Sequence, residues 1–121
     1  MNVLLVDDSK LIYLMVSQML KDVGHDCTWA EDGTKAIEIL SKDKTLQLIL
    51  LDWNMTKMSG PEFLEKNIKE KITTAPIIMM TTENSPDYIK TAFTLGAVDY
   101  LIKPFTKDIL FNKISQLELN K

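Results

Sequence analysis

Short apolar runs alternate with segments of helical periodicity along the whole chain of 121 residues. Such alternation is the sequence sign of repeated βα units around a mostly parallel sheet. Strands are expected at Val3 to Val6, Cys27 to Ala30, Leu46 to Leu51, Ile77 to Met80 and Val98 to Ile102. A helical pattern follows each run, so the chain is predicted to form one α/β domain of five βα pairs.

Capping residues and apolar spacing predict where the helices begin and which side they bury. The expected boundaries are Asp8 or Ser9 and Gly24 for the first helix, Asp32 and Gly33 for the start of the second, Pro61 as the first residue of the third, and Ser85, Pro86 and Gly96 for the fourth. The expected inner faces are Leu11, Met15, Met19 and Val23 in the first helix, Ala36, Ile37 and Leu40 in the second, and Leu110, Ile114 and Leu117 in the last.

Composition narrows the class of protein. With 45% hydrophobic residues, the chain suits one compact core, and no residues remain for a second domain, so residues 1–121 are expected to form a single unit without an output domain. The net charge of −3 and the absence of a basic run argue against direct nucleic-acid binding. A lone Cys27 and the lack of a signal peptide or membrane-length apolar stretch predict a cytoplasmic protein without membrane insertion.

Polar residues follow the apolar strands at the points where the strands end. They are Asp7 and Asp8, Asp52, Thr81 and Lys103. Because the carboxyl ends of parallel strands meet at one edge of an open sheet, where ligands bind, we expect these side chains to become neighbours. Taken singly, each has a plainer explanation as a helix cap, a turn residue or a strand-end hydroxyl. Their joint placement favours a functional site.

The electrostatics of this cluster predict a metal ion. At about 4 Å and an effective dielectric constant near 20, two carboxylates repel each other by roughly 4 kcal/mol. Lys103 offsets part of that repulsion, and Mg²⁺, which prefers oxygen ligands, would offset more. A lysine and Mg²⁺ together suit phosphoryl transfer, which depends on positioning and charge neutralisation, and Asp52 is then the candidate nucleophile.

Several motifs give the chain a family resemblance across its whole length. The segments LLVDDS, LILLDWNM with MSG following, IIMMTTE and YLIKPF resemble the receiver domain of two-component response regulators. Within that family the chain is most similar to the stand-alone chemotaxis regulators of the CheY type. The resemblance implies a flavodoxin-like, doubly wound five-stranded sheet in the order 2-1-3-4-5, which the hydrophobic pattern alone does not supply.

The resemblance also implies roles for individual residues. Asp52 would be the phosphoacceptor, and Asp8, Asp52 and the backbone carbonyl of Asn54 would hold Mg²⁺, with Asp7 assisting through water. Thr81 and Lys103 would contact the phosphoryl group. The expected protein is a phosphoacceptor that catalyses only its own phosphorylation and dephosphorylation. Asn54 and Glu83 would influence how quickly the phosphoryl group is lost.

A phosphoryl group at Asp52 is expected to act as a switch. In the family that the chain resembles, an aromatic residue at the position of Tyr100 moves inward and reshapes the face formed by the fourth helix, fifth strand and fifth helix. Ile89 and Lys113 would also lie on that face. The implied partners are a histidine kinase as donor and, for a chemotaxis regulator, a flagellar motor switch protein.

Two further expectations concern the backbone. The Lys103–Pro104 bond is predicted to be cis by resemblance to the family. Thr56 and Ser59 stand where proline and aspartate are common in the family, so the loop after Asp52 is expected to be looser. Trp53, next to Asp52, should report on the site by fluorescence, with Trp29 as an unresponsive background.

Other functions fit the sequence less well. A single-domain phosphorelay intermediate or another stand-alone regulator is the nearest alternative to a chemotaxis role. An aspartate-nucleophile phosphatase is disfavoured because Asn54 stands where such enzymes carry a second aspartate. A degenerate receiver is disfavoured by the intact acidic set, and a nucleotide-binding fold by the lack of a glycine-rich turn after the first strand.

Overall fold

The computed structural model, which describes residues 1–119, contains a five-stranded parallel sheet in the order β2-β1-β3-β4-β5. The strands are β1 (Asn2–Val6), β2 (Asp26–Ala30), β3 (Leu48–Asp52), β4 (Ile77–Thr81) and β5 (Asp99–Ile102). The helices are α1 (Lys10–Asp22), α2 (Gly33–Lys42), α3 (Gly60–Glu70), α4 (Pro86–Thr94) and α5 (Lys107–Leu119). The predicted fold, strand order and alternation of elements are confirmed.

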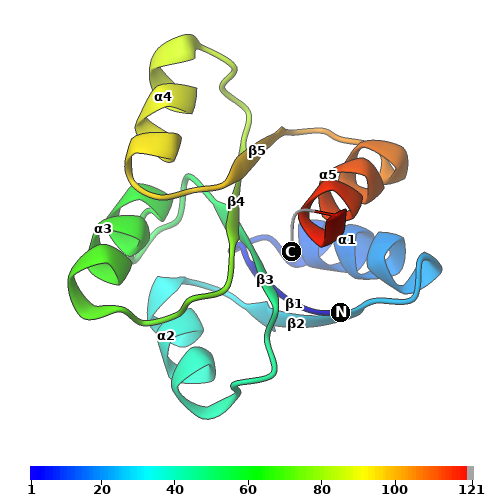
Figure 1. Cartoon of the computed structure of the whole chain (residues 1–121), viewed down its shortest axis with the longest axis horizontal. Coiled ribbons are helices and arrows are strands. Elements are labelled where there is room, and N and C mark those ends of the chain that lie inside the picture. Colours follow the sequence, from blue (N-terminus) through cyan, green and yellow to red (C-terminus); the bar gives the residue numbers. More distant parts are fainter. Residues whose placement is uncertain (120–121) are drawn as a thin grey trace.

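Helices cover both faces of the sheet, with α2, α3 and α4 on one side and α1 and α5 on the other (Figure 1). This arrangement follows from the alternation of side chains along each strand. In β1, Leu4 and Val6 join the core beneath α2 and α3, while Val3 and Leu5 join the core beneath α1 and α5. The two cores therefore lie on opposite faces of the same sheet.

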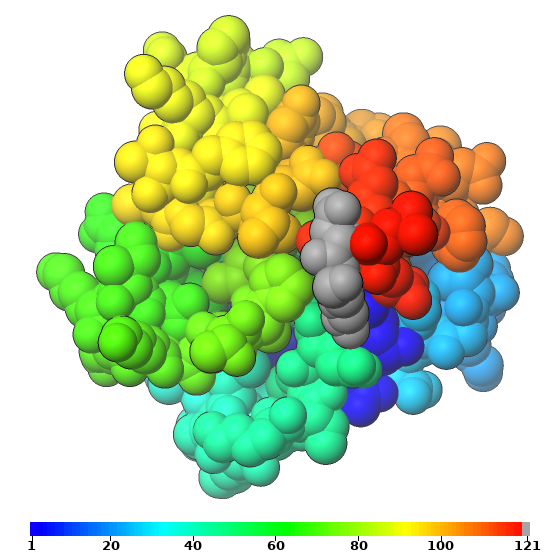
Figure 2. All heavy atoms as spheres, viewed as in Figure 1, coloured from blue at the N-terminus to red at the C-terminus, as the bar shows by residue number. Residues whose placement is uncertain are grey.

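The middle of the sheet is fully enclosed. Every residue of β3 and β4 is buried, as expected of parallel strands that carry helices on both faces. The space-filling view shows the green and yellow segments of one helical layer on the left and the blue and red segments of the other on the right (Figure 2). A polar side chain at the end of either strand is consequently held between layers that cannot shift easily.

The inner face of α1 differs from the prediction. The structure buries Val16 and Leu20, whereas Leu11 and Met15 are 66% and 44% exposed. Residues four apart in a helix are separated by 400°, so the predicted stripe drifts by about 40° at each step. A true inner face must mix spacings of three and four, and the Val16 and Leu20 side of α1 meets the sheet.

Most helices begin and end at the residues that the sequence predicts. Ser9 caps α1 and Asp32 caps α2, each accepting a backbone N–H, and Gly96 closes α4 with a φ of 105°. Ser59 caps α3 in a reciprocal capping box with Glu62. Pro61 is the second residue of α3, one position later than predicted, because Ser59 takes the cap.

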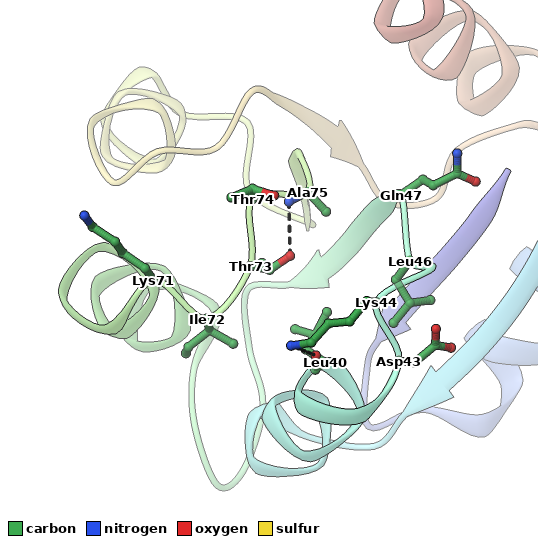
Figure 3. Close-up of a pocket in the computed structure, with 10 residues that line it drawn as sticks. All are labelled: Leu40, Asp43, Lys44, Leu46, Gln47, Lys71, Ile72, Thr73, Thr74 and Ala75. Atoms are coloured by element: carbon green, nitrogen blue, oxygen red, sulfur yellow. Dashed lines mark hydrogen bonds between the residues drawn. The ribbon is translucent and has the colours of Figure 1, made fainter.

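One recess lies far from the strand carboxyl ends. Its volume is about 490 Å³, and it is formed by the segments that lead into β3 and β4, including Lys44, Lys71 and Thr73 (Figure 3). Lys44 donates a hydrogen bond to the Leu40 carbonyl there at 3.1 Å. Within residues 1–119 every helix is too short or too polar to cross a bilayer.

Gly60 permits α3 to begin against the end of β3. A Cβ atom at this position would lie 2.6 Å from the Asp52 carbonyl oxygen and 2.6 Å from the Met79 methyl group. Gly60→Ala should therefore lower the free energy of unfolding by about 1–3 kcal/mol and change Trp53 fluorescence. Gly24→Ala is the control: its Cβ meets open space, but the positive φ strains alanine, so it should also lose stability while leaving Trp53 emission unchanged. Urea unfolding and emission spectra test this, and an unchanged Trp53 signal in Gly60→Ala would contradict it.

Candidate functional site

Three aspartates gather at the carboxyl edge of the sheet, as the sequence predicts. Asp7 and Asp8 directly follow β1, and Asp52 is the last residue of β3, the strand beside it. One carboxylate oxygen from each lies within 4.8 Å of the others. Asp7 and Asp52 are buried and Asp8 is exposed, so the cluster forms a pocket that is open on one side.

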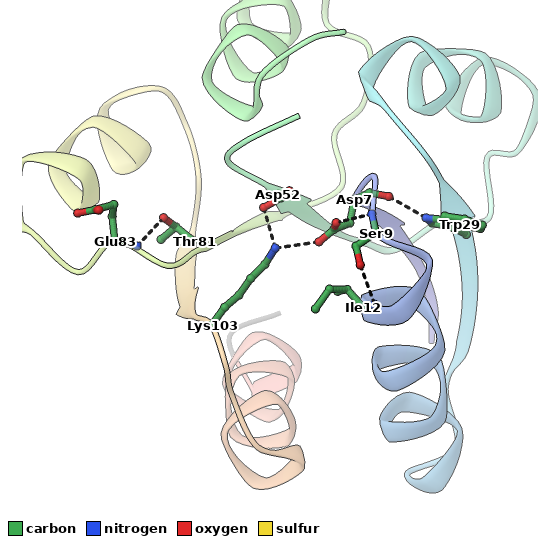
Figure 4. A network of polar contacts seen from close by, with 8 residues as sticks. All are labelled: Asp7, Ser9, Ile12, Trp29, Asp52, Thr81, Glu83 and Lys103. Carbon is green, nitrogen blue, oxygen red and sulfur yellow. Dashed lines mark hydrogen bonds and ion pairs between the residues drawn. The ribbon is translucent and has the colours of Figure 1, made fainter. Parts of the chain in front are cut away.

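Lys103 joins the two buried aspartates. It follows β5, and its ammonium lies 2.9 Å from Asp7 Oδ2 and 2.8 Å from Asp52 Oδ1 (Figure 4). These residues are separated by 96 and 51 positions in the chain. Three carboxylates and one ammonium leave a net charge of −2 in the pocket, which matches one divalent cation.

Burial and charge shift the ionisation of the central pair. Burial raises the pKa of Asp52 above its usual value, the hydrogen bond from Lys103 offsets part of that rise, and the Asp7 charge adds to it. Burial lowers the pKa of Lys103, but its hydrogen bonds to Asp52 and Asp7 outweigh this effect and hold its pKa above the usual value. Lys103 is therefore a fixed positive charge, and Asp52 is a carboxylate that water solvates poorly.

The backbone fixes the relative positions of Thr81 and Lys103. The Lys103 amide donates to the Thr81 carbonyl at 2.7 Å, which carries the pairing of β4 and β5 up to the site. The Thr81 hydroxyl is buried and accepts the Glu83 amide at 3.0 Å. The Lys103–Pro104 bond is cis, as predicted.

The loop between β3 and α3 is held at both ends. Trp53 donates its amide to the Met80 carbonyl and accepts the Gly60 amide, both at 2.9 Å. Asn54 lies in the loop just after Asp52 and is exposed, so its carbonyl as a metal ligand stays a prediction. Ser59, which replaces the common aspartate, still performs the capping function.

The aromatic residue Tyr100 is half-buried in β5. The Phe93 ring meets it edge-on with 6.2 Å between centroids, and the Lys113 ammonium lies 5.0 Å from its ring centre. Lys113 also pairs with Asp99 at 2.8 Å. Tyr100 thus sits between α4 and α5, on the face where the sequence predicts it.

Trp29 is a residue of the site that the sequence reasoning missed. Its indole Nε1 donates to the Asp7 carbonyl at 2.8 Å, so it touches the backbone of the acidic cluster (Figure 4). This contact removes the basis for treating Trp29 as a fluorescence background. Only its place in β2 beside β1 could have pointed to the contact, since an isolated tryptophan carries no motif.

The donor set fits a magnesium ion. Its donors are carboxylate oxygens from Asp7, Asp8 and Asp52, the ligands that this hard cation prefers, and few enough to leave positions for water. The side nearest the exposed Asp8 gives access from solvent. With a lysine beside Asp52, the pocket can neutralise the oxygens of a bound phosphoryl group.

The fold and the pocket define a doubly wound α/β domain with three aspartates and a lysine at the carboxyl ends of its strands. Residues 3–115 match the family described as response regulator receiver domain. The chain belongs to this family, whose members are phosphoacceptor signalling domains. The predicted family membership is confirmed.

Relatives and solved structures agree with this assignment. The chain is 35% identical to a chemotaxis protein CheY homolog of Campylobacter jejuni, with 97% of this chain and 92% of the relative covered. It is 36% identical to the two-component response regulator ORR3 of Oryza sativa, with 85% and 79% covered. The structure of chemotaxis response regulator CheY4 of Vibrio cholerae is similar at a TM-score of 0.86 and 35% identity, with 95% and 96% covered.

The raised pKa of Asp52 predicts a pH-dependent stability. Because the folded chain holds this proton more tightly than the unfolded chain, Asp52 should contribute a loss of stability to the metal-free wild type as the pH rises from about 4. Asp52→Asn removes that loss, so at neutral pH the variant should be the more stable by about 1 kcal/mol or less, given partial screening by solvent. Thermal unfolding with a chelator, from pH 4 to 8, measures this.

The control for this prediction is Asp108→Asn, which neutralises an exposed aspartate of α5. It should follow the wild-type pH profile. Added Mg²⁺ should stabilise the wild type and Asp108→Asn more than Asp52→Asn, because the last lacks one carboxylate of the cluster. A lower stability of Asp52→Asn at neutral pH without metal would contradict the argument.

Proposed function

We propose that this protein is a phosphorylation-dependent signalling switch that accepts a phosphoryl group on Asp52 in a Mg²⁺-dependent reaction. The observation that carries the proposal is the contact of Lys103 with both Asp7 and Asp52 beside a cluster of three carboxylates. The donor is proposed to be a histidine kinase, in keeping with the receiver family.

In the proposed reaction a carboxylate oxygen of Asp52 attacks the phosphorus atom of a phosphohistidine. A P–O bond forms while the P–N bond breaks, and the imidazole nitrogen keeps the electron pair. Mg²⁺, held by Asp8, Asp52 and the Asn54 carbonyl with Asp7 acting through water, would supply charge neutralisation for the transferred oxygens. Lys103 already contacts Asp52 and would bind the same phosphoryl group.

The change of state is proposed to pass through Thr81 and Tyr100. The Thr81 hydroxyl accepts the Glu83 amide at 3.0 Å in this structure and would turn to donate its O–H to a phosphoryl oxygen. Movement of Thr81 would leave room for Tyr100 to turn inward. Tyr100 would then leave Phe93 and Lys113, its neighbours on α4 and α5, and the surface of α4, β5 and α5 would change shape.

The output is proposed to be a binding event of this domain itself, on the face formed by α4, β5 and α5. Chemotaxis is the favoured pathway because the matched Campylobacter and Vibrio proteins are named chemotaxis proteins. A flagellar motor switch protein is then the proposed target. The similar identity to a rice two-component response regulator supports the second candidate, a stand-alone regulator or phosphorelay intermediate in another pathway.

Phosphorylation itself can be tested with a small acyl phosphate. With acetyl phosphate and Mg²⁺, the wild type should gain the mass of one phosphoryl group, because the pocket supplies both nucleophile and countercharge. Asp52→Asn should gain none and Asp108→Asn should behave as the wild type. Intact-mass spectrometry, repeated with a chelator, measures the product. An unmodified wild type, or equal modification of Asp52→Asn, would refute the assignment.

Partner binding should depend on the state of Asp52. Recovery of a flagellar switch protein should rise several-fold when beryllofluoride, a phosphoryl mimic, is added to the wild type with Mg²⁺. Tyr100→Ala should weaken this response, since the proposed switch passes through that ring, whereas Thr28→Ala, on the exposed edge of β2, should not. Equal recovery with and without the mimic would defeat the chemotaxis role and favour the second candidate.

A further inference from the structure

We propose that Trp29 is a positioning residue that orients the Asp7–Asp8 peptide for cation binding. It acts through the Asp7 backbone and would touch neither the cation nor the phosphoryl group. The proposal rests on the proposed function only for the identity of the cation as Mg²⁺.

Both backbone polar groups of Asp7 are bonded to β2. The Asp7 amide donates to the Ala30 carbonyl at 3.1 Å, which extends the pairing of β1 and β2. The Asp7 carbonyl accepts the indole N–H of Trp29 at 2.8 Å. In this second bond the donor is a side chain and not a backbone amide of β2. It forms where the chain leaves the sheet and enters the site.

Trp29 is itself fixed by α1. Its ring stacks on Tyr13 with 4.9 Å between centroids and an interplanar angle of 6°. Tyr13 lies in the first turn of α1, where its amide donates to the Ser9 carbonyl at 3.1 Å. The indole therefore connects the two ends of the Asp7 to Ser9 segment, from the sheet on one side to the helix start on the other.

Asp8 is the residue that depends on this arrangement. The Asp7 carboxylate is held by the Ser9 amide and Lys103, both at 2.9 Å. The Asp8 carboxylate, in contrast, is exposed to solvent. Because the peptide between Asp7 and Asp8 is planar, the bond from Trp29 to the Asp7 carbonyl also sets the direction in which the chain continues to Asp8. Groups that orient a metal ligand commonly change metal affinity when they are removed.

The experiment measures Mg²⁺ affinity by calorimetry without any phosphoryl donor. Trp29→Phe removes the N–H and keeps an aromatic ring for Tyr13. Benzothienylalanine at position 29 keeps the shape of indole and replaces the N–H with sulfur. Both should weaken Mg²⁺ binding by about threefold to tenfold. The control, Tyr13→Phe, keeps both rings and the donor and should bind as the wild type.

A second readout separates positioning from general damage. At saturating Mg²⁺, both Trp29 variants should reach the wild-type rate of phosphorylation by acetyl phosphate, because Asp52 and Lys103 are untouched. Unchanged Mg²⁺ affinity in both variants would overturn the proposal, as would an equal loss in Tyr13→Phe. A loss in Trp29→Phe alone would assign the effect to ring packing and overturn the role of the N–H. If the wild type binds no Mg²⁺, both the proposed function and this inference fail.

Discussion

The ion pairs of Lys103 with Asp7 and Asp52 are the interaction on which the site depends. They join the ends of β1, β3 and β5 across the carboxyl edge of the sheet. Without the ammonium, two buried carboxylates and the neighbouring Asp8 would face one another with nothing between them, an arrangement that costs several kcal/mol. The position of Lys103 is in turn fixed by its backbone bond to Thr81. Lys103 therefore takes part both in the ion pairs of the pocket and, through its amide, in the pairing of β4 and β5.

The pocket carries more negative charge than Lys103 can balance. Lys103 compensates one negative charge, burial still raises the pKa of Asp52, and the pocket keeps an excess of two negative charges. A divalent cation stabilises a pocket with excess negative charge more than it would stabilise a neutral pocket. The unfavourable charge is tolerated because the strands that carry it are enclosed between two helical layers.

Much of this architecture was predictable from the sequence, and the failures have physical causes. Strand ends were found because apolar runs stop abruptly at Asp7, Asp52, Thr81 and Lys103, and parallel topology then requires those ends to meet. The strand order required the family resemblance, since hydrophobic pattern does not encode which strands are neighbours. The face of α1 was misjudged because a strict four-residue spacing drifts around a helix. Trp29 was missed because its contact with Asp7 depends on one rotamer and on the neighbouring strand.

The contacts around the pocket differ in how they can respond to a change of charge. On the β1 side, the Trp29 indole donates to the Asp7 carbonyl and the Ser9 amide donates to the Asp7 carboxylate. The indole is also stacked on Tyr13, which resists its displacement. On the β4 and β5 side, the Thr81 hydroxyl and the Tyr100 ring are held by one amide, one edge-on ring and one ammonium. Individually weak contacts of this kind can be exchanged for new ones at small cost. In the switch that we propose, a phosphoryl group on Asp52 would therefore move the α4, β5 and α5 side while the β1 side stays in place.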